Sequence, residues 1–238
     1  GKLTIATGQP AYEPWVMNDK PESGEGYEAA VAYAVADKLG FKKSDVVWTR
    51  TAFDTAIAPG AKDWDFNIQQ FGITDERKKA VDFSSSYYND SQSVVVKKDS
   101  KFANATKVSD LKDATVGVMV GTLAYDYAKA NIKDDIQTFN DDAALAQALD
   151  AGQIDALVTS TVECVYMVQS EQVKDSKVLG RLPDSEDKSG MGIVLPKDSK
   201  LTAAVTKAVD DLNADGTIKK LQDKWLAEYT TDLTELKK

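Results

Sequence analysis

The feature that most constrains the fold of this chain is an alternation of short apolar runs with segments of helical periodicity. The alternation occurs twice, once before about residue 88 and once between about residues 93 and 179. Strands that alternate with helices favour an α/β fold with mostly parallel sheets. Two such series within 238 residues predict two lobes with a cleft between them.

The expected elements follow from this pattern. Strands are expected where apolar and β-branched residues cluster, at 3–6, 45–49, 66–69, 93–96, 115–120, 154–159 and 190–195. Helices are expected where apolar residues recur every three or four positions, at 27–39, 53–58, 108–113, 123–131, 143–150, 162–169, 201–212 and after 216. Ligands of open α/β sheets bind at the carboxyl ends of strands, which points to segments 9–15, 69–77, 119–123 and 159–163.

Composition excludes several classes of site. The net charge of −9 disfavours binding to nucleic acid or to an anionic membrane. The chain has no histidine and only one cysteine, Cys164, so it can form neither a Ser-His-Asp triad nor an internal disulfide. We interpret Cys164 as a small core residue and expect no metal site. No apolar run approaches the roughly 20 residues of a membrane span. No signal peptide is visible at Gly1, and we expect that a leader has been removed.

Motifs for bound phosphates and metals are also missing from the sequence. There is no GxGxxG after an expected strand, no GxxxxGK[ST] and no DxDxDG loop, so we expect no cofactor. Gly121-Thr122 lies between an expected strand and an expected helix, where N–H groups and the helix dipole favour an anion. This signal is weak alone, because Gly-Thr before a helix is also ordinary capping.

Segment 71–88, FGITDERKKAVDFSSSYY, combines six charged residues with an aromatic pair. Thr74 suits a helix N-cap, the acids at 75–76 suit a first turn, and the lysines at 78–79 suit its end. A short solvated helix therefore explains most of these charges. It does not explain Arg77, whose planar fork matches a carboxylate.

Residues 71–84, followed by Tyr87-Tyr88, resemble the signature of the periplasmic-type amino-acid-binding proteins of ABC transporters, solute-binding protein family 3. Four further segments match this family in order: 26–28 (GYE), 108–112 (VSDLK), 121–122 (GT), and 214–218 (ADGTI) leading to 224–226 (KWL). The resemblance covers nearly the whole chain. It implies a two-lobed type II periplasmic-binding-protein-like fold with two hinge strands, in which residues 1–91 and 188–238 form lobe 1 and residues 92–187 form lobe 2. The ligand would lie between the lobes and stabilise a closed form.

The resemblance also implies ligand-binding residues in the first lobe. Arg77 resembles the family arginine that binds the ligand carboxylate. Tyr12 and Phe53 resemble the aromatic pair that sandwiches the ligand side chain. Gln70 and Gly72 resemble positions whose backbone groups meet the carboxylate and ammonium of the ligand.

In the second lobe, Thr122 and the Leu123 amide resemble a second carboxylate contact. The chain departs from the family pattern at Ser160, where an aspartate usually pairs with the ligand ammonium. It departs again at Gly72, where the family commonly has a hydroxyl residue, and at Gln9, where it often has an acid.

A buried ammonium without a counter-charge would be costly. Either another acid provides the charge, with Glu13, Asp126 and Glu163 as candidates, or the ligand lacks a standard α-ammonium. Both alternatives stay open at this point.

The resemblance therefore implies an extracytoplasmic solute-binding protein, in the periplasm or on the cell surface as a lipoprotein. It would be a monomer, would bind a small polar ligand such as an amino acid or a related carboxylate, and would deliver it to the transmembrane subunits of an ABC permease. We expect no enzymatic activity. The alternatives are a small-acid dehydratase-like enzyme on the same scaffold, with Glu163 as its acid, or the ligand-sensing domain of a receptor.

Overall fold

The structure, a computed structural model, describes residues 1–230 and 233–238 and divides the chain into two compact units. Unit 1 comprises Gly1–Asn89 and Lys188–Ala227. Unit 2 comprises Asp90–Asp187 and the described part of Glu228–Lys238. The chain therefore passes from one unit to the other three times.

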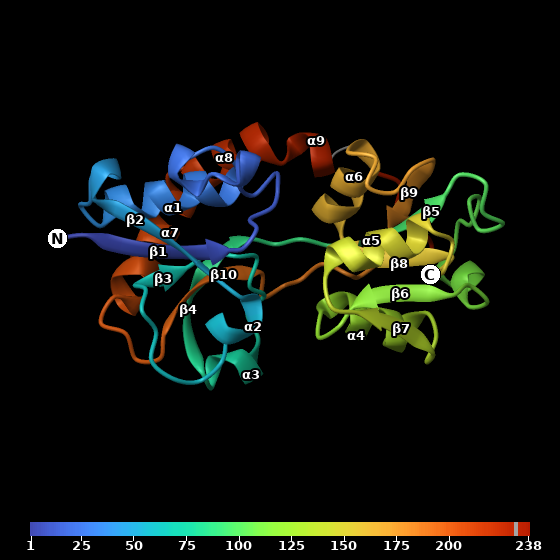
Figure 1. Ribbon diagram of the computed structural model, residues 1–238, viewed down its shortest axis with the longest axis horizontal. Coiled ribbons are helices and arrows are strands. Elements are labelled where there is room, and N and C mark those ends of the chain that lie inside the picture. Colours follow the sequence, from blue (N-terminus) through green and yellow to red (C-terminus); the bar gives the residue numbers. More distant parts are fainter. Residues whose placement is uncertain (231–232) are drawn as a thin grey trace. The chain divides into compact units, whose positions relative to one another are not determined.

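Unit 1 is built on a five-stranded sheet with helices on both sides (Figure 1). Its strands are β1 (Leu3–Gly8), β2 (Val46–Thr51), β3 (Phe66–Asn67), β4 (Val81–Tyr88) and β10 (Met191–Pro196), in the order β2-β1-β3-β10-β4. Its helices are α1 (Tyr27–Lys38), α2 (Phe53–Ala56), α3 (Asp75–Lys78), α7 (Thr202–Ala214) and α8 (Thr217–Trp225), with short 3-10 helices at Met17–Asp19, Pro21–Ser23 and Lys43–Asp45. Strand β1 runs parallel to β2 and β3, whereas β10 is antiparallel to β3 and β4.

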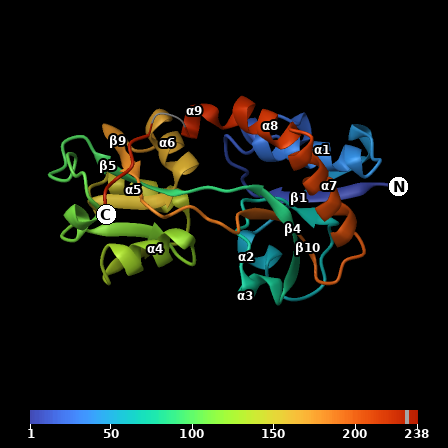
Figure 2. The same cartoon turned by 180° about the vertical axis from the view of Figure 1, so that it is seen from behind.

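Two apolar layers cover the sheet of unit 1. Helices α1, α7 and α8 pack together, and α7 lies against β4 (Figure 2). A second cluster, which includes Trp64, Phe71 and Val194, packs with the residues of α2. Gly26 precedes α1 with φ of +104°, and a Cβ there would lie 2.5 Å from the Trp15 carbonyl oxygen. Glycine is therefore required where α1 begins.

Unit 2 has a second five-stranded sheet with the same mixture of directions. Its strands are β5 (Gln92–Lys97), β6 (Val116–Met119), β7 (Ile136–Phe139), β8 (Ala156–Ser160) and β9 (Ser176–Arg181), in the order β7-β6-β8-β5-β9. Its helices are α4 (Leu123–Asn131), α5 (Asp142–Asp150) and α6 (Thr161–Gln169), with a 3-10 helix at Val108–Leu111 and with α9 (Ala227–Thr230) starting at the last residue of unit 1. Strands β6, β7 and β8 are parallel, and β5 is antiparallel to β8 and β9.

The core of unit 2 follows the alternation of side chains along β5. Val94 and Val96 enter a cluster that includes residues of α4. Val95, between them, enters the cluster formed with α5 and α6. Strand β5 is therefore buried on both faces, which explains its continuous apolar sequence.

The C-terminal segment differs from the expectation that residues 188–238 share one lobe. Leu236 is buried in the core of unit 2, and its N–H donates to the Arg181 carbonyl oxygen at 2.8 Å. Gly180 makes room for this segment, because a Cβ there would lie 2.8 Å from the Thr234 carbonyl oxygen. The described residues after Ala227 therefore belong with unit 2.

Three strands are absent from the sequence-based expectation: β4, β7 and β9. Each mixes polar and apolar residues without a clean two-residue period, and all three lie at the edges of their sheets. Edge strands bury fewer side chains, so the pattern that marks a strand is weaker there.

Candidate functional site

In unit 1 the candidate residues lie after β1, β2 and β3, parallel neighbours whose carboxyl ends share one edge of the sheet. Arg77 is on α3, a helix capped by Thr74, whose hydroxyl accepts from the Arg77 N–H at 3.1 Å. The Nη1 atom of Arg77 donates to the Gly72 carbonyl oxygen at 2.7 Å. The guanidinium also lies over the Phe53 ring, with its Cζ 5.4 Å from the ring centre. Arg77 is therefore positioned by its own loop and by an aromatic face.

Phe53, which contacts the Arg77 guanidinium, also packs against Phe71. Its ring packs on that of Phe71 with centres 4.7 Å apart and planes at 30°. Phe71 is fully buried, and its carbonyl oxygen accepts from the Gly192 N–H of β10 at 3.0 Å. The structure thus brings together three residues singled out from the sequence: Phe53 of α2, and Gly72 and Arg77 of a segment that Phe71 ties to the sheet.

Gln70 is held by an acid that the sequence analysis does not single out, Glu28. The Gln70 N–H donates to Glu28 Oε2 at 2.8 Å, its side-chain amide contacts Glu28 Oε1, and its φ is +50°. Glu28 is fully buried, and its other partner is the Tyr87 hydroxyl. Burial raises the pKa of Glu28, against the lowering effect of the hydrogen bonds from Tyr87 and Gln70.

A sequence signal for Glu28 does exist. It lies on α1 three and seven positions before Val31 and Val35, on the stripe that the helix buries. An acid on a buried stripe needs hydrogen-bond partners, so it marks a polar network in the core. Here that network fixes the backbone of Gln70.

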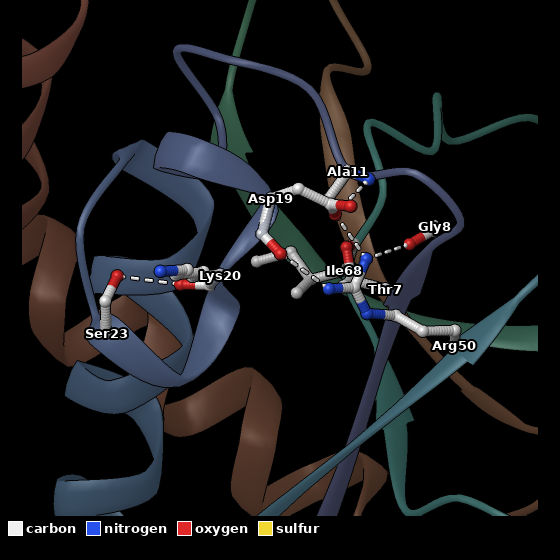
Figure 3. Close-up of polar contacts among 8 residues, drawn as sticks. All are labelled: Thr7, Gly8, Ala11, Asp19, Lys20, Ser23, Arg50 and Ile68. Carbon is white, nitrogen blue, oxygen red and sulfur yellow. Dashed lines mark hydrogen bonds and ion pairs between the residues drawn. The ribbon is translucent and has the colours of Figure 1, made fainter.

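The loop after β1 carries Gln9 and Tyr12, and an ion pair holds it (Figure 3). Arg50 of β2 contacts Asp19 through Nη1 at 2.5 Å and donates to the Gly8 carbonyl oxygen at 2.9 Å. Asp19 also accepts from the Ala11 N–H at 2.8 Å. The Arg50 hydrogen bond lowers the pKa of Asp19, so the pair stays ionised at neutral pH.

Tyr12 is 41% exposed on this loop, and Gln9 is exposed as well. Glu13, one of the acids considered as a counter-charge, accepts from the Asn18 N–H at 3.0 Å. That bond gives Glu13 a local role in the loop. The pairing of Tyr12 with Phe53 around a ligand stays a prediction.

In unit 2 the carboxyl ends of β6, β7 and β8 meet at one edge of the sheet, and α4, α5 and α6 begin there. Thr122 caps α4: its hydroxyl donates to the Met119 carbonyl oxygen at 2.7 Å and accepts from the Tyr125 N–H at 3.3 Å. Leu123, the first residue of α4, is 38% exposed. The first N–H groups of a helix lack partners within it, so this end suits an anion.

The end of β8 carries Ser160, and Glu163 lies in the first turn of α6. Both are partly exposed, whereas Asp126 on α4 is exposed. Thr159, just before Ser160, donates to Asp142 Oδ1 at 3.5 Å. Burial, and to a smaller extent the charge of the neighbouring Asp141, raise the pKa of Asp142 to about 6, against the lowering effect of the Thr159 hydrogen bond.

Asp90, the first residue of unit 2, also faces Ser160 and was not singled out from the sequence. It is 5% exposed, and burial raises the pKa of its carboxyl to about 7. The N–H groups of Ser91 and Val162, the Ser160 hydroxyl and the Arg181 charge lower this pKa without overcoming the burial. The sequence pattern marks Asp90 only as a polar residue between two strands.

Other kinds of site find little support among the described residues. No group of three or more His, Cys, Asp or Glu side chains in residues 1–230 and 233–238 could hold a metal ion. Cys164 is fully buried, and burial raises the pKa of its thiol well above the ordinary value. No helix in the described part of the chain is both long enough and apolar enough to span a membrane.

Comparison with known proteins decides the family. Residues 3–228 match the family model of the bacterial extracellular solute-binding proteins, family 3. The chain belongs to this family. It is 30% identical over 223 residues to the L-cystine-binding protein TcyJ of Escherichia coli (strain K12), covering 92% of this chain and 81% of that protein.

Solved structures of amino-acid-binding proteins agree with this assignment. An ancestral arginine-binding protein bound to arginine shares 31% identity and a TM-score of 0.76, with 95% of this chain and 99% of that chain covered. An ancestral amino-acid-binding protein described as a precursor of cyclohexadienyl dehydratase shares 30% identity and a TM-score of 0.75, with 94% and 95% covered. The type II periplasmic-binding-protein fold expected from the sequence is confirmed.

Proposed function

We propose that this family 3 solute-binding protein captures an amino acid and delivers it to an ABC permease. The observation that carries the proposal is the setting of Arg77, whose guanidinium is held by the Gly72 carbonyl oxygen and the Phe53 ring at the carboxyl end of the sheet in unit 1. Such a fixed fork suits an α-carboxylate, which every free amino acid carries. Relatives named for cystine and for arginine binding support the same ligand class.

In this proposal units 1 and 2 are the two lobes, and the passages at residues 89–90 and 187–188 are the hinge. On either side of the passages the two chain segments are joined: Asn89 Nδ2 donates to the Lys188 carbonyl oxygen at 3.3 Å, and the Asp187 N–H donates to the Asp90 carbonyl oxygen at 2.8 Å. A ligand that contacts both lobes favours the closed state because it binds that state better.

Each unit then contributes part of the binding site. In unit 1, Arg77 binds the carboxylate, Tyr12 and Phe53 enclose the side chain, and Gln9 faces its outer end. The Gln70 N–H is already bonded to Glu28, which leaves the backbone carbonyl of Gln70 for the ligand ammonium. Gly72, whose carbonyl oxygen accepts from Arg77, then provides a further backbone group for the ligand.

In unit 2, Thr122 presents the first N–H groups of α4, including that of Leu123, as the second carboxylate contact. Ser160 and Glu163 lie at the adjacent end of β8 and the start of α6. We place the mature protein outside the cytoplasm, as a monomer in the periplasm or as a lipoprotein on the cell surface. Its partners are the transmembrane subunits of the permease.

A thermal-shift screen against the twenty standard amino acids, L-cystine and a set of small organic acids tests the ligand class. A ligand at 100 times its dissociation constant adds about 2.7 kcal/mol to the free energy of unfolding. For a chain of this size that raises the melting temperature by about 5–10 °C. Shifts from organic acids alone, with none from an amino acid, would contradict the proposal.

A second candidate is an enzyme that dehydrates a small acid. The observation that favours it is the likeness to the precursor of cyclohexadienyl dehydratase, a binding protein from which an enzyme arose. Glu163 is then the general acid. Turnover of a bound acid that is lost in Glu163→Gln supports this candidate, whereas release of every bound acid unchanged eliminates it.

A further inference from the structure

Asp90 has an unsatisfied carboxylate oxygen in a buried position. Its side chain is 5% exposed, and Oδ1 accepts from the Ser91 N–H at 2.8 Å. Oδ2 is buried and has no hydrogen-bond partner among the described residues. Buried carboxylates are normally paired or fully hydrogen-bonded, because desolvation of the charge is costly.

The hydroxyl groups around Asp90 do not satisfy this oxygen. The Ser91 and Thr161 hydroxyls bond to each other at 2.7 Å, and the Ser93 hydroxyl bonds to Thr161 at 2.8 Å. The Ser160 hydroxyl faces the carboxylate without reaching Oδ2 in hydrogen-bond geometry. Most buried polar atoms have a hydrogen-bond partner, so the unsatisfied Oδ2 of Asp90 needs an explanation beyond holding the fold.

The position of Asp90 relates it to the candidate binding edge. Ser160 ends β8 and pairs in register with Gln92 of β5, two residues after Asp90, and β5 and β8 lie side by side (Figure 1). The Asp90 carboxylate therefore lies at the carboxyl end of β8, next to the residue that occupies the usual place of an acid. Asp90 can therefore provide, within the same unit, the negative charge that Ser160 lacks.

We propose that Asp90, acting beside Ser160, is the residue of unit 2 that binds the positively charged group of the ligand. This inference rests on the proposed function, since it concerns the ammonium of a bound amino acid. The ligand ammonium donates a hydrogen bond to Oδ2 and provides a positive counter-charge in contact with the buried carboxylate. Asp142 is less suited, because it already accepts from Thr159 and lies beside Asp141.

The pH dependence of binding follows from the charges around Asp90. These are Arg181 on β9, the Cys164 thiol with Asp142 and Glu163 near it, and Asp187, whose N–H donates to the Asp90 carbonyl oxygen. Arg181 is the cation among them, and the thiol is neutral near pH 7 because burial raises its pKa. In the free protein Asp90 is protonated below pH of about 7.

An ammonium binds the ionised form, so binding below pH 7 must expel a proton. The association constant should therefore rise by up to about tenfold per pH unit as pH increases toward 7, and level off above about pH 8. Calorimetry in two buffers of different ionisation enthalpy should show the release of up to about one proton at pH 6.

The experiment compares Asp90→Asn with the matched control Asp142→Asn, using the tightest ligand from the panel of twenty amino acids and L-cystine. Asp90→Asn should weaken binding by about thirtyfold or more and abolish proton release, whereas Asp142→Asn should bind as the parent does. The double variant Asp90→Asn with Ser160→Asp moves the carboxylate from position 90 to position 160, and it should restore much of the affinity.

Stability separates this role from a structural one. At pH 8, Asp90→Asn should melt at the same temperature as the parent or higher, because a buried charge has been removed. Binding by the parent together with undiminished binding by Asp90→Asn would overturn the inference and leave the proposed function intact. A lower melting temperature with equal affinity would make Asp90 a structural residue. If no amino acid binds the parent, the proposed function fails and the inference fails with it.

Discussion

Replacing Arg77 by alanine and by lysine separates the loss of its charge from the loss of its planar fork. A carboxylate held by two charged hydrogen bonds loses about 3–6 kcal/mol when both are removed. Arg77 is partly exposed, so solvent screening favours the lower end, about 3 kcal/mol or a 150-fold weaker affinity. Arg77→Lys keeps the charge and one bond, and should lose about tenfold.

The same substitution has a small expected effect on stability. Arg77→Ala removes the bond to the Gly72 carbonyl oxygen and the contact with the Phe53 ring, together about 1–2 kcal/mol. The melting temperature should fall by about 3–6 °C, so the variant stays folded at 25 °C. Loss of binding would then report on the ligand contact and not on unfolding.

Isothermal titration calorimetry at pH 8 measures the affinities. The matched control is Lys79→Ala, which removes a 74% exposed cation that pairs with Glu76 at 2.9 Å. The control should bind within about twofold of the parent. Binding by folded Arg77→Ala within about threefold of the parent would refute the assignment of Arg77 to the carboxylate.

Three further predictions concern unit 2. Leu236→Ala should lower the free energy of unfolding by about 2–3 kcal/mol in a urea titration, because Leu236 is 3% exposed in that core; an unchanged midpoint would place the C-terminal segment outside it. Thr122→Ala should lower the free energy of unfolding by about 1 kcal/mol through the lost helix cap, and it should weaken carboxylate binding. A variant as stable as the parent would contradict the capping role. Asp142 has a folded-state pKa of about 6, above its unfolded value of about 3.9, so its contribution is present below pH 4 and lost as pH rises to 6. The free energy of unfolding of Asp142→Asn should therefore rise by about 2 kcal/mol relative to that of the parent between pH 4 and 7. If the free energies of variant and parent changed in parallel with pH, the raised pKa would be wrong.

Much of the fold could be predicted from local sequence. The stripe of Tyr27, Val31 and Val35 ends at Gly40, whose φ of +89° is the left-handed conformation that ends a helix. The buried run of β5 and the cap at Thr122 follow the same local rules. Such features are recoverable because each depends on residues within one or two turns of one another.

The features that sequence reasoning missed depend on distant residues. Leu236 reads as part of a polar tail, and its burial depends on the space beside Gly180. Glu28 and Gln70 meet only when α1 packs beside the end of β3. Asp90 becomes a candidate because β5 and β8 bring it to Ser160, a pairing across about 70 residues that no local pattern indicates.

Small-angle X-ray scattering of the protein with and without a saturating amino acid tests the central claim most directly. Capture by closure of two lobes requires the radius of gyration to fall when the ligand binds, and to remain unchanged in Arg77→Ala under the same conditions. A bound amino acid, verified by calorimetry on the same sample, with no change in the radius of gyration would contradict the account.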